Sequence, residues 1–582
     1  MRNAFGTDLA DRSRRTSGHV RLVAGMLMGF AAFAGAGGLA RGSRPEVPGP
    51  DVPDMQKTAP RATIYPALGC PGYVYSTNDF QVTVDGRQAP VRDYRPFGNS
   101  LEDRDRNYHV VHVGVGPEPV RVTVDAREPV ETFSISPKAY GIAGEADARV
   151  LAFTLDRPRY LAIRVNAKNM LFILADPIET NRPASSGVDP ASGRDVFNVS
   201  SAPYRVDATS SRLATQALQR AIEDAANASG GGIVYVPEGL YATHRLTLRS
   251  HVWLYLEPGA MLTPDPVRGN WWTGWEPDHI LTVTNTVGTK IYGRGVIDCR
   301  NEAMSLQHKP EDKFRLRLRP MKIAKVVDFT LEGVTGAESG EWTFSVEGGE
   351  RIALRNVKVL NEKKLGTNDG IDICGGTDVV VEHCFVTTMD DAFCVKGMRG
   401  AVRNVRFHDN VADTTKSAFK VGMQGMDEVQ GVSVSEHHVI RCYKGFDFSH
   451  YYGSAAWRDI RFTDCRVEQV HGKAGNPVRG AGTPIRLLID RQTTFGYPKG
   501  VGPIDGVSFK RIQFDDPGPN VIALKGYDAT NGVRDVAFDD VVLGGRKLTA
   551  DDSRLQLHEH VEGVTVDGAP VRAGGSPEET RP

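Results

Sequence analysis

A short pattern recurs between residues 328 and 538: a turn residue, an apolar residue, a residue of any kind and a second apolar residue. Most successive copies begin 23 to 29 residues apart, and one step is about twice as long, which predicts an irregular coil or an inserted loop there. This period is typical of stacked coils, because one coil cannot bury its apolar side chains alone. The copies are "DFTL" at 328, "RIAL" at 351, "DVVV" at 378, "NVRF" at 404, "GVSV" at 431, "DIRF" at 459, "GVSF" at 506 and "DVAF" at 535.

One segment ahead of these copies has helical periodicity. "LATQALQRAIEDAANA" places Leu218, Ala221, Ile222 and Ala225 on one face, hydroxyls between residues 209 and 211 can cap it, and three glycines follow it. Such a helix would cover the open apolar end of a stack. Leucine-rich repeats have a similar period, but their Leu and Asn spacing is absent. The pattern therefore predicts an all-β fold, a right-handed parallel β-helix over residues 205–570.

Alternating apolar and polar residues mark an earlier region, residues 61–185. Runs such as "FQVTVDG", "YHVVHVGVG" and "PVRVTVDA" are separated by Gly, Pro and Asp. This alternation predicts a small antiparallel β-sandwich-like domain. Pro-rich and polar segments predict linkers at 41–60 and 186–204, and residues 571–582 are predicted to be a disordered tail.

The first 40 residues follow the layout of an export signal. Basic residues precede an uncharged apolar run from Leu22 to Ala40 that ends in small residues. This predicts a signal peptide over residues 1–40 and a secreted or periplasmic protein that is not stably inserted in a membrane after cleavage. An uncleaved membrane anchor is the alternative, because the run approaches the length that spans a bilayer.

Composition narrows the function classes. The 70 basic and 71 acidic residues nearly cancel, which argues against a nucleic-acid partner. Seven cysteines are too few for a disulfide framework, and Cys374, Cys384 and Cys394 fall at strand positions where we expect them buried. No Cys or His cluster has zinc-site spacing, so neither a metal nor another cofactor is expected. The oligomeric state stays open.

Three candidate catalytic acids lie in "GTNDGIDICGGTDVVVEHCFVTTMDDAFCVKG", residues 366–397. Asp369 precedes Asp390 by 21 residues, and Asp391 follows directly. Residues one period apart lie on adjacent coils about 4.8 Å apart, so these carboxyl groups should cluster. Inverting glycosidases use two carboxyl groups about 6.5 to 9.5 Å apart, and crowding raises the pKa of at least one. The alternative is that the acids end strands at solvent-facing turns.

"TNDGIDI" and "MDDAFCVKG" resemble the NTDG and DD motifs of the polygalacturonase family, glycoside hydrolase family 28, in the pectate-lyase-like right-handed β-helix superfamily. The likeness covers about residues 205–470 and includes "LRSHVWLYLEPGAML" and "YGRGVIDCR". It implies that Asp390 is the general acid and that Asp369 and Asp391 hold the attacking water, giving hydrolysis with inversion. The N-terminal β domain resembles that of the related dextranase family.

The chain departs from the family pattern at two places. Ser417 stands where the family has the histidine of its GHG motif, and Asp447 and Ser449 stand where it has the Arg and Lys that bind the galacturonate carboxylate. An aspartate there would repel a uronic acid, so an altered pocket and a neutral or differently decorated polysaccharide are predicted as an alternative. Three residues are candidates to supply positive charge from other coils: Lys396, Lys420 and Arg486.

Aromatic residues give further candidates for substrate contacts. His450, Tyr451 and Tyr452 are predicted to line the +1 side of a groove, with a surface loop as the alternative. A loop with Trp271, Trp272 and Trp275 is predicted either to stack on sugars or to pack against the N-terminal domain. Trp342 is in a strand context and is expected in the core.

Three functional classes follow from these residues. The acids favour a glycoside hydrolase that acts on a polysaccharide substrate. A polysaccharide lyase is an alternative, because Lys396 or Lys420 beside the acids could abstract a proton. A non-catalytic carbohydrate-binding β-helix is the third class.

Overall fold

The computed structural model describes residues 60–67, 79–94, 107–166, 168–271, 276–305, 316–361, 366–472 and 482–571. The predicted signal peptide, nearly all of the predicted linker 41–60 and nearly all of the predicted tail lie outside these residues. In the described part of the chain, no helix is long and apolar enough to cross a membrane.

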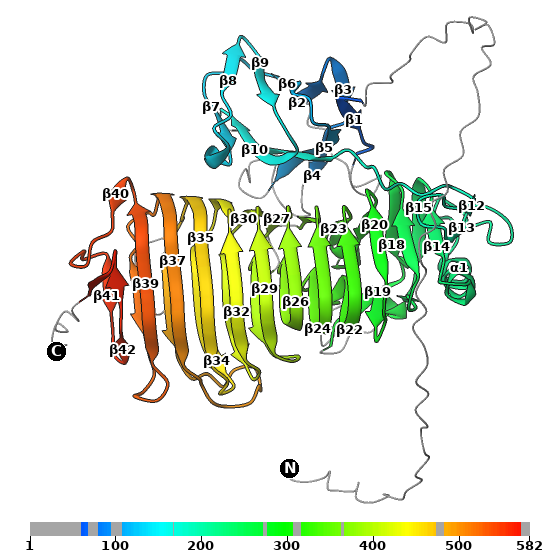
Figure 1. Ribbon diagram of the computed structural model, residues 1–582. Coiled ribbons are helices and arrows are strands. Elements are labelled where there is room, and N and C mark those ends of the chain that lie inside the picture. Colours follow the sequence, from blue (N-terminus) through cyan, green and yellow to red (C-terminus); the bar gives the residue numbers. More distant parts are fainter. Residues whose placement is uncertain are drawn as a thin grey trace, which may run out of the picture. The chain divides into compact units, whose positions relative to one another are not determined.

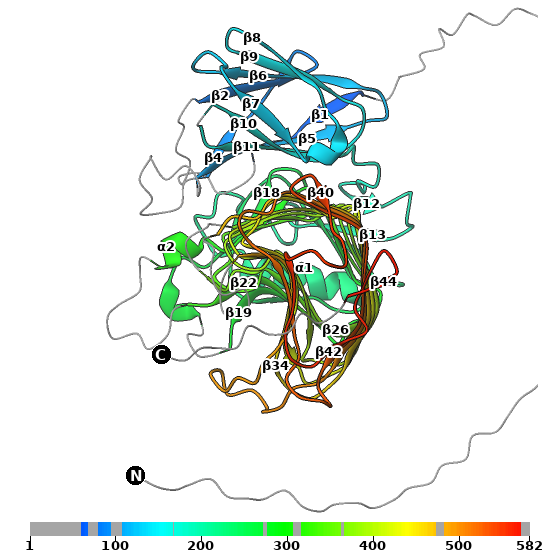
Figure 2. The same cartoon turned by 90° about the vertical axis from the view of Figure 1, so that its left-hand side faces the viewer.

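The recurring apolar pattern builds a stack of coils. The first apolar residue of each copy pairs in parallel with that of the next copy. The stack runs along Figure 1, and its coils superpose in Figure 2. The paired residues are Phe329, Ile352, Val379, Val405, Val432, Ile460, Val507 and Val536.

The turn residue of each copy has a positive φ. This left-handed conformation is open to Gly and, at low cost, to Asp and Asn, which explains most of the residues used. Arg351 is the exception, and its guanidinium binds the Asp328 carboxylate of the preceding copy at 2.6 Å. The angles are Asp328 54°, Arg351 55°, Asp378 56°, Asn404 51°, Gly431 67°, Asp459 52°, Gly506 65° and Asp535 54°.

The doubled step is one coil with inserted loops. Strand β35 (Trp457–Gln469) pairs directly with β37 (Ile504–Asp516), although β36 (Thr483–Ile489) lies between them in sequence. β36 itself stacks on β34 (Lys444–Tyr452). The extra residues therefore lie in the connections before and after β36, which agrees with the predicted inserted loop.

Among the described residues, the strands of the stack pair into three parallel ladders, in which the longest strands bend from one ladder into the next. Besides β34 and β36, the first ladder contains β16 (Leu246–Thr247), β19 (Asp278–Thr284), β22 (Leu318–Glu332), β24 (Phe344–Arg355), β26 (Ile371–Glu382), β28 (Phe393–Gly397), β31 (Ser417–Gly425), β38 (Ile522–Lys525) and β41 (Leu555–Leu557). The second ladder shares β22, β24 and β26 with the first. It also contains β35, β37, β13 (Asp195–Asn198), β14 (Ile233–Val236), β17 (Trp253–Leu256), β20 (Lys290–Gly293), β29 (Val402–His408), β32 (Val429–Ser435), β39 (Val533–Leu543), β42 (Val561–Glu562) and β43 (Thr565–Val566). The third contains β15 (Gly239–Thr243), β18 (Ala260–Pro264), β21 (Val296–Asp298), β23 (Thr335–Ala337), β25 (Lys358–Leu360), β27 (Phe385–Thr388), β30 (Val411–Thr414) and β33 (His438–Arg441) before it joins β35.

The segment 186–204 differs from the predicted linker. It forms β12 (Gly187–Val188) and β13, and β13 pairs in parallel with β14. Val196 lies opposite Ile233, and the Phe197 ring packs against the core of the stack. This apolar pair places the segment in the β-helix, although its Pro, Ser and Gly content is that of a linker.

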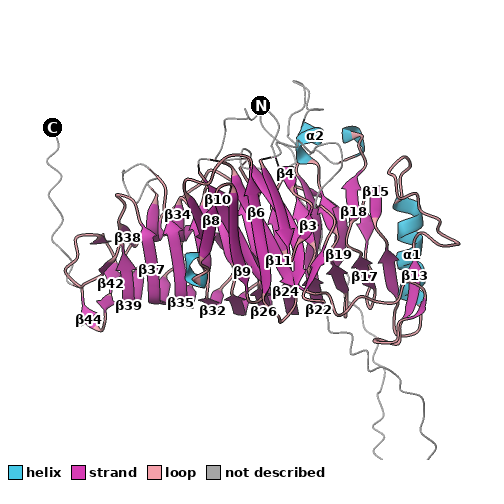
Figure 3. Cartoon of the chain, turned by 90° about the horizontal axis from the view of Figure 1, so that it is seen from above, coloured by secondary structure: helices cyan, strands magenta, loops and turns pink. Residues whose placement is uncertain are grey.

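Helix α1 (Thr215–Asn227) covers the start of the stack, where it contacts β13 and β14, and it lies beside β13 in Figure 3. Its predicted apolar face is buried in the core of the first coils. The predicted caps are wrong, because the helix starts after Ala214 and has no side-chain cap. The hydroxyls of Thr209 and Ser211 donate instead to the Asp207 carboxylate.

The N-terminal domain contains two sheets with an apolar core between them. β5 and β11 pair in parallel, whereas the neighbouring pairs are antiparallel. One sheet contains β1 (Ala62–Ile64), β4 (Arg92–Tyr94), β5 (Tyr108–Val115), β7 (Phe133–Ser136), β10 (Arg159–Val165) and β11 (Met170–Pro177). The other contains β2 (Phe80–Val84), β3 (Arg87–Ala89), β6 (Val120–Ala126), β8 (Gly144–Asp147) and β9 (Val150–Leu155).

The outer face of the β5 sheet packs on the third ladder, and both belong to one compact unit, Ala59–Pro582. Asp176 lies at the centre of this interface and is fully buried. Its carboxylate accepts hydrogen bonds from Tyr160 at 2.6 Å and His112 at 2.8 Å, and it binds Arg294 and Lys358 of the β-helix. Burial would raise the pKa of Asp176, but Lys358 and Arg294 outweigh it and hold the pKa well below its usual value.

Candidate active site

The three predicted acids line one cavity of about 550 Å³. One residue separates Asp369 from the start of β26, and one residue separates Asp391 from the start of β28. Ile371 of β26 pairs with Phe393 of β28, and the Gly370 N–H donates to the Asp391 carbonyl at 2.9 Å. The acids are therefore stacked on adjacent coils.

The neighbouring carboxyl groups of Asp390 and Asp391 have opposite pKa shifts. Burial, followed by the charge of Asp391, raises the pKa of Asp390. Burial would also raise the pKa of Asp391, but the Lys420 ammonium, 3.0 Å away, outweighs it and lowers the pKa. One carboxyl group is thus favoured as a proton donor and its neighbour as an anion, the division that acid and base catalysis requires.

Backbone amides fix the orientation of both carboxyl groups. The Thr367 N–H donates to Asp390 at 2.7 Å, and the Asp391 N–H donates to the other Asp390 oxygen at 2.9 Å. The Ser417 N–H donates to Asp391 at 3.1 Å. Ser417, predicted from the resemblance to stand in place of a histidine, therefore contacts a catalytic candidate through its backbone.

Asp369 is buried beside a lysine. The Lys396 ammonium binds Asp369 at 2.7 Å and also binds Asp372. Burial raises the pKa of Asp369 well above its usual value. Burial would lower the pKa of Lys396, but Asp369 and Asp372 outweigh it and raise the pKa. Lys396 is therefore held as a cation.

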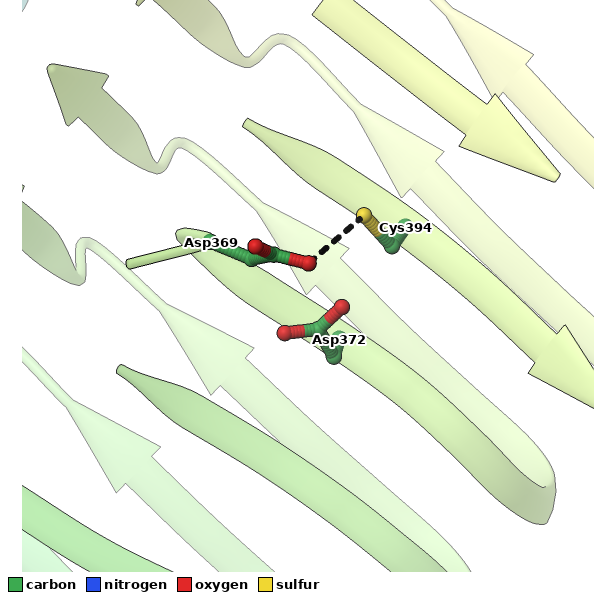
Figure 4. A group of neighbouring side chains, drawn as sticks. All are labelled: Asp369, Asp372 and Cys394. Atoms are coloured by element: carbon green, nitrogen blue, oxygen red, sulfur yellow. Dashed lines mark hydrogen bonds between the residues drawn. The ribbon is translucent and has the colours of Figure 1, made fainter. Parts of the chain in front are cut away.

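Asp369, Asp372 and Cys394 have potential metal-ligand atoms within 4.8 Å of one another, and Figure 4 shows the three side chains converging. The Lys396 ammonium already binds both of these carboxylates. A metal ion would have to compete with this internal cation. The geometry therefore supports an ion-paired lysine at this position better than a metal centre.

Asp447 is not free to repel an anionic sugar. It is fully buried and binds Arg486 at 2.7 Å, Lys444 at 3.4 Å and Lys420 at 3.8 Å. Burial would raise the pKa of Asp447, but these three cations outweigh it and lower the pKa well below the usual range. The repulsion expected from the sequence is corrected, because the carboxylate is neutralised and holds cations around the cavity.

The structure brings together six of the predicted site residues and leaves four outside the cavity lining. The six are Asp369, Asp390, Asp391, Lys396, Ser417 and Lys420. Arg486 is buried against Asp447, His450 is buried with its ring stacked on Trp457 at 4.1 Å, and Tyr451 and Tyr452 pack with Leu488. The predicted direct substrate contacts of His450 and the two tyrosines are therefore not supported, because packing buries these side chains.

Trp342 was expected in the core but lines the cavity. Its indole ring lies under the Lys396 ammonium at 3.9 Å and the Arg319 guanidinium at 4.7 Å. Trp342 directly follows Glu341 at the turn before β24, one coil before Asp369. The same periodicity that located the acids, extended back by one coil, would have found it.

Other cavity residues were missed because they come from separate coils and from the loop after β36. These are Arg317, Glu341, Thr367, Lys416, Gly422, Met423, Gln424, Tyr443, Lys444, Phe495 and Tyr497. Two of them are lysines that differ in burial. Lys416 is exposed, whereas Lys444 is partly buried, and this burial lowers the pKa of Lys444 to about 8.

Within the predicted tryptophan loop, the structure describes Trp271, whose ring is not available to stack on a sugar. Trp271 is buried and donates its indole N–H to the Asp265 carbonyl at 3.0 Å. Trp272 and Trp275 lie outside the described residues.

Comparison with known proteins agrees with this geometry. Residues 268–478, which include all three acids, match the model of Glycosyl hydrolases family 28. The predicted family resemblance is confirmed. A search of curated proteins found no match.

Two solved structures show the same fold at low sequence identity. A hyperthermoactive exopolygalacturonase from Thermotoga maritima is 16% identical, with a TM-score of 0.51, and the match covers 67% of this chain and 94% of that chain. Dex49A from Penicillium minioluteum is 13% identical, with a TM-score of 0.57, and the match covers 87% of this chain and 96% of that chain. The predicted fold class, a right-handed parallel β-helix after a small β domain, is confirmed.

Proposed function

We propose that this polygalacturonase-like glycoside hydrolase cleaves the glycosidic bonds of an anionic, pectin-like polysaccharide with inversion at the anomeric carbon. The match of residues 268–478 to the family supports the reaction class. The observation that carries the mechanism is the pair of opposite pKa shifts on Asp390 and Asp391 within one cavity.

The proposed mechanism assigns a separate role to each acid. Asp390 donates its proton to the glycosidic oxygen as the bond from that oxygen to the anomeric carbon breaks. Asp391 and Asp369 hold a water on the opposite face of the sugar, and ionised Asp391 accepts a proton from this water as its oxygen bonds to the anomeric carbon. The products are a new reducing end and a released hydroxyl group.

The charge of the cavity supports an anionic substrate. Five of the side chains that line it are cationic and four are acidic, and the buried carboxylates of Asp372 and Asp447, outside the lining, pair with three of these cations. The support for an anionic substrate therefore rests on the accessible lysines rather than on the total charge. The cations are Arg317, Lys396, Lys416, Lys420 and Lys444, and the acids are Glu341, Asp369, Asp390 and Asp391. Exposed Lys416 and partly buried Lys444 can meet a sugar carboxylate, and the Trp342 ring can contact a sugar face.

The lysines disfavour the lyase alternative. A lyase needs a neutral base, but the acids around Lys396 and Lys420 outweigh burial and raise the pKa of both ammonium groups. Lys444 has a lowered pKa of about 8, so it is the candidate for the neutral base that a lyase would need.

The first experiment is a product screen of the full chain without residues 1–40, using polygalacturonic acid, rhamnogalacturonan, dextran and other α-glucans. Reducing ends and ultraviolet absorbance are measured together, and proton NMR follows the anomeric configuration of the first product. We expect reducing ends from a pectin without absorbance, with the inverted anomer. Unsaturated, absorbing products would establish a lyase, and cleavage of dextran alone would overturn the anionic substrate.

We also propose that residues 1–40 direct export and are then removed. The apolar run from Leu22 to Ala40 after basic residues supports this proposal. Mass spectrometry of the protein recovered outside the cytoplasm would show a chain shortened at about residue 40, whereas an anchored chain would keep its full mass in the membrane fraction.

A further inference from the structure

Buried hydrogen bonds connect the N-terminal domain to the two turns that carry the proposed catalytic acids, residues 366–369 and 388–392, called the catalytic turns below. Tyr108, the first residue of β5, donates its hydroxyl to the Asn361 carbonyl at 3.1 Å. Its ring is packed within its own domain, against Tyr94 and Phe172. Asn361 directly follows β25, on the coil that precedes Asp369. The N-terminal domain thus anchors the backbone of the β-helix one coil from the acids.

The Asn361 side chain continues these contacts toward the site. Its amide group donates to the Asn368 carbonyl at 2.9 Å and to the Thr343 hydroxyl at 2.8 Å. Its amide oxygen accepts the Ser339 N–H at 3.0 Å. Asn361 is fully buried, so any other orientation would leave buried donors and acceptors unpaired.

Asn368 joins both catalytic turns. It directly precedes Asp369, and its side-chain oxygen accepts the Asp390 N–H at 3.2 Å and the Thr388 hydroxyl at 3.0 Å. Asn368 and Thr388 are both fully buried. The position of Asn368 therefore determines the backbone position of the general acid in the proposed mechanism.

We infer that Tyr108, Asn361 and Asn368 are positioning residues through which the N-terminal domain fixes the turn that presents Asp390. This inference rests on the proposed function for its catalytic consequence. Its structural content, that the domain interface holds the catalytic turns in place, can be measured without any substrate.

The test uses the full chain with Tyr108→Phe, which removes only the hydroxyl. Tyr160→Phe is the matched control, because Tyr160 is buried at the same interface and its hydroxyl donates to Asp176 at 2.6 Å, within its own domain, instead of to the β-helix. Hydrogen–deuterium exchange is measured on peptides that cover residues 366–369 and 388–392. We expect faster exchange in these peptides for Tyr108→Phe and unchanged exchange there for Tyr160→Phe.

Kinetics on the substrate found in the product screen supply the second measurement. Tyr108→Phe should lower kcat by about five- to tenfold and leave KM within about twofold, because one hydrogen bond is lost and the acid is displaced. The alkaline limb of the kcat/KM profile should move to higher pH, since a weaker Thr367 N–H bond would raise the pKa of Asp390. Tyr160→Phe should change neither quantity.

The outcomes separate this inference from the proposed function. Equal exchange in the two variants, or an equal kcat in both, would overturn the positioning role. If Asp390→Asn keeps full turnover while Tyr108→Phe loosens the turns, the proposed catalytic role of Asp390 fails and the structural connection stands.

Discussion

Asp390 carries the most direct prediction at the scale of single residues. Asp390→Asn should lower kcat by about a hundredfold or more, because it removes the proton donor and keeps the shape of the side chain. Thermal stability should change little, because two effects oppose each other. The raised pKa of Asp390 means that its charge is disfavoured in the fold, but the new amide NH2 loses one of the two backbone N–H bonds that the carboxyl oxygens accept. Initial rates and melting temperatures of the variant and wild type check both statements. Wild-type turnover in the variant would rule out Asp390 as the acid.

Deprotonation of Lys444 should weaken substrate binding at alkaline pH. Because burial lowers its pKa to about 8, the side chain is charged below that pH and becomes neutral above it. KM for an anionic polysaccharide should therefore rise as pH increases through about 8. Lys444→Met should raise KM about fivefold at pH 7 and remove this rise, whereas Lys444→Arg should keep KM low at pH 9. A KM that does not change with pH in the wild type would contradict this role.

Sequence located residues that follow the repeat and missed those that depend on packing. Asp369 and Asp390 were found because their separation is close to one coil. Asp447 was misjudged, because its meaning depends on Arg486, which is 39 residues away in sequence and 2.7 Å away in space. His450 was misjudged because no spacing rule shows that its ring stacks on Trp457.

At the scale of elements, the left-handed turn residues limit what each coil accepts. Asp535 is exposed, and its φ is 54°. Asp535→Val should lower the free energy of unfolding by about 1 to 2 kcal/mol, because a β-branched residue is strained in this conformation, whereas Asp535→Gly should be close to neutral. Urea unfolding of the two variants measures the difference. Equal stability would show that the coil relaxes around the substitution.

Sequence predicted the stacked strands well and their ends less well. The copies of the apolar pattern gave the second ladder directly, because each copy contains both the turn residue and the strand that follows it. The start of α1 and the strands within 186–204 were missed. In both cases a partner elsewhere decides the structure: Asp207 takes the hydroxyls expected as caps, and β14 pairs with β13.

At the scale of the whole molecule, Asp176 holds the two domains together. Asp176→Asn should lower the free energy of unfolding by about 3 to 5 kcal/mol, because Arg294 and Lys358 would keep buried charges without their anion. Lys138→Met is the control, since Lys138 pairs with Asp515 across the same interface from an exposed position, and its loss should cost about 1 kcal/mol or less. Calorimetry on both variants tests this, and equal losses would contradict a central role for Asp176.

The complete burial of Asp176 has a consequence for the response to ionic strength. Counter-ions screen charges that water reaches, over about 8 Å at physiological salt, but they cannot enter the dry contact around this carboxylate. Added sodium chloride should therefore leave the union of the domains unchanged. Lys416 is exposed at the cavity, so the same salt should weaken its attraction for a polyanion. A brackish medium would then weaken substrate binding at salt concentrations that leave the contact between the domains intact.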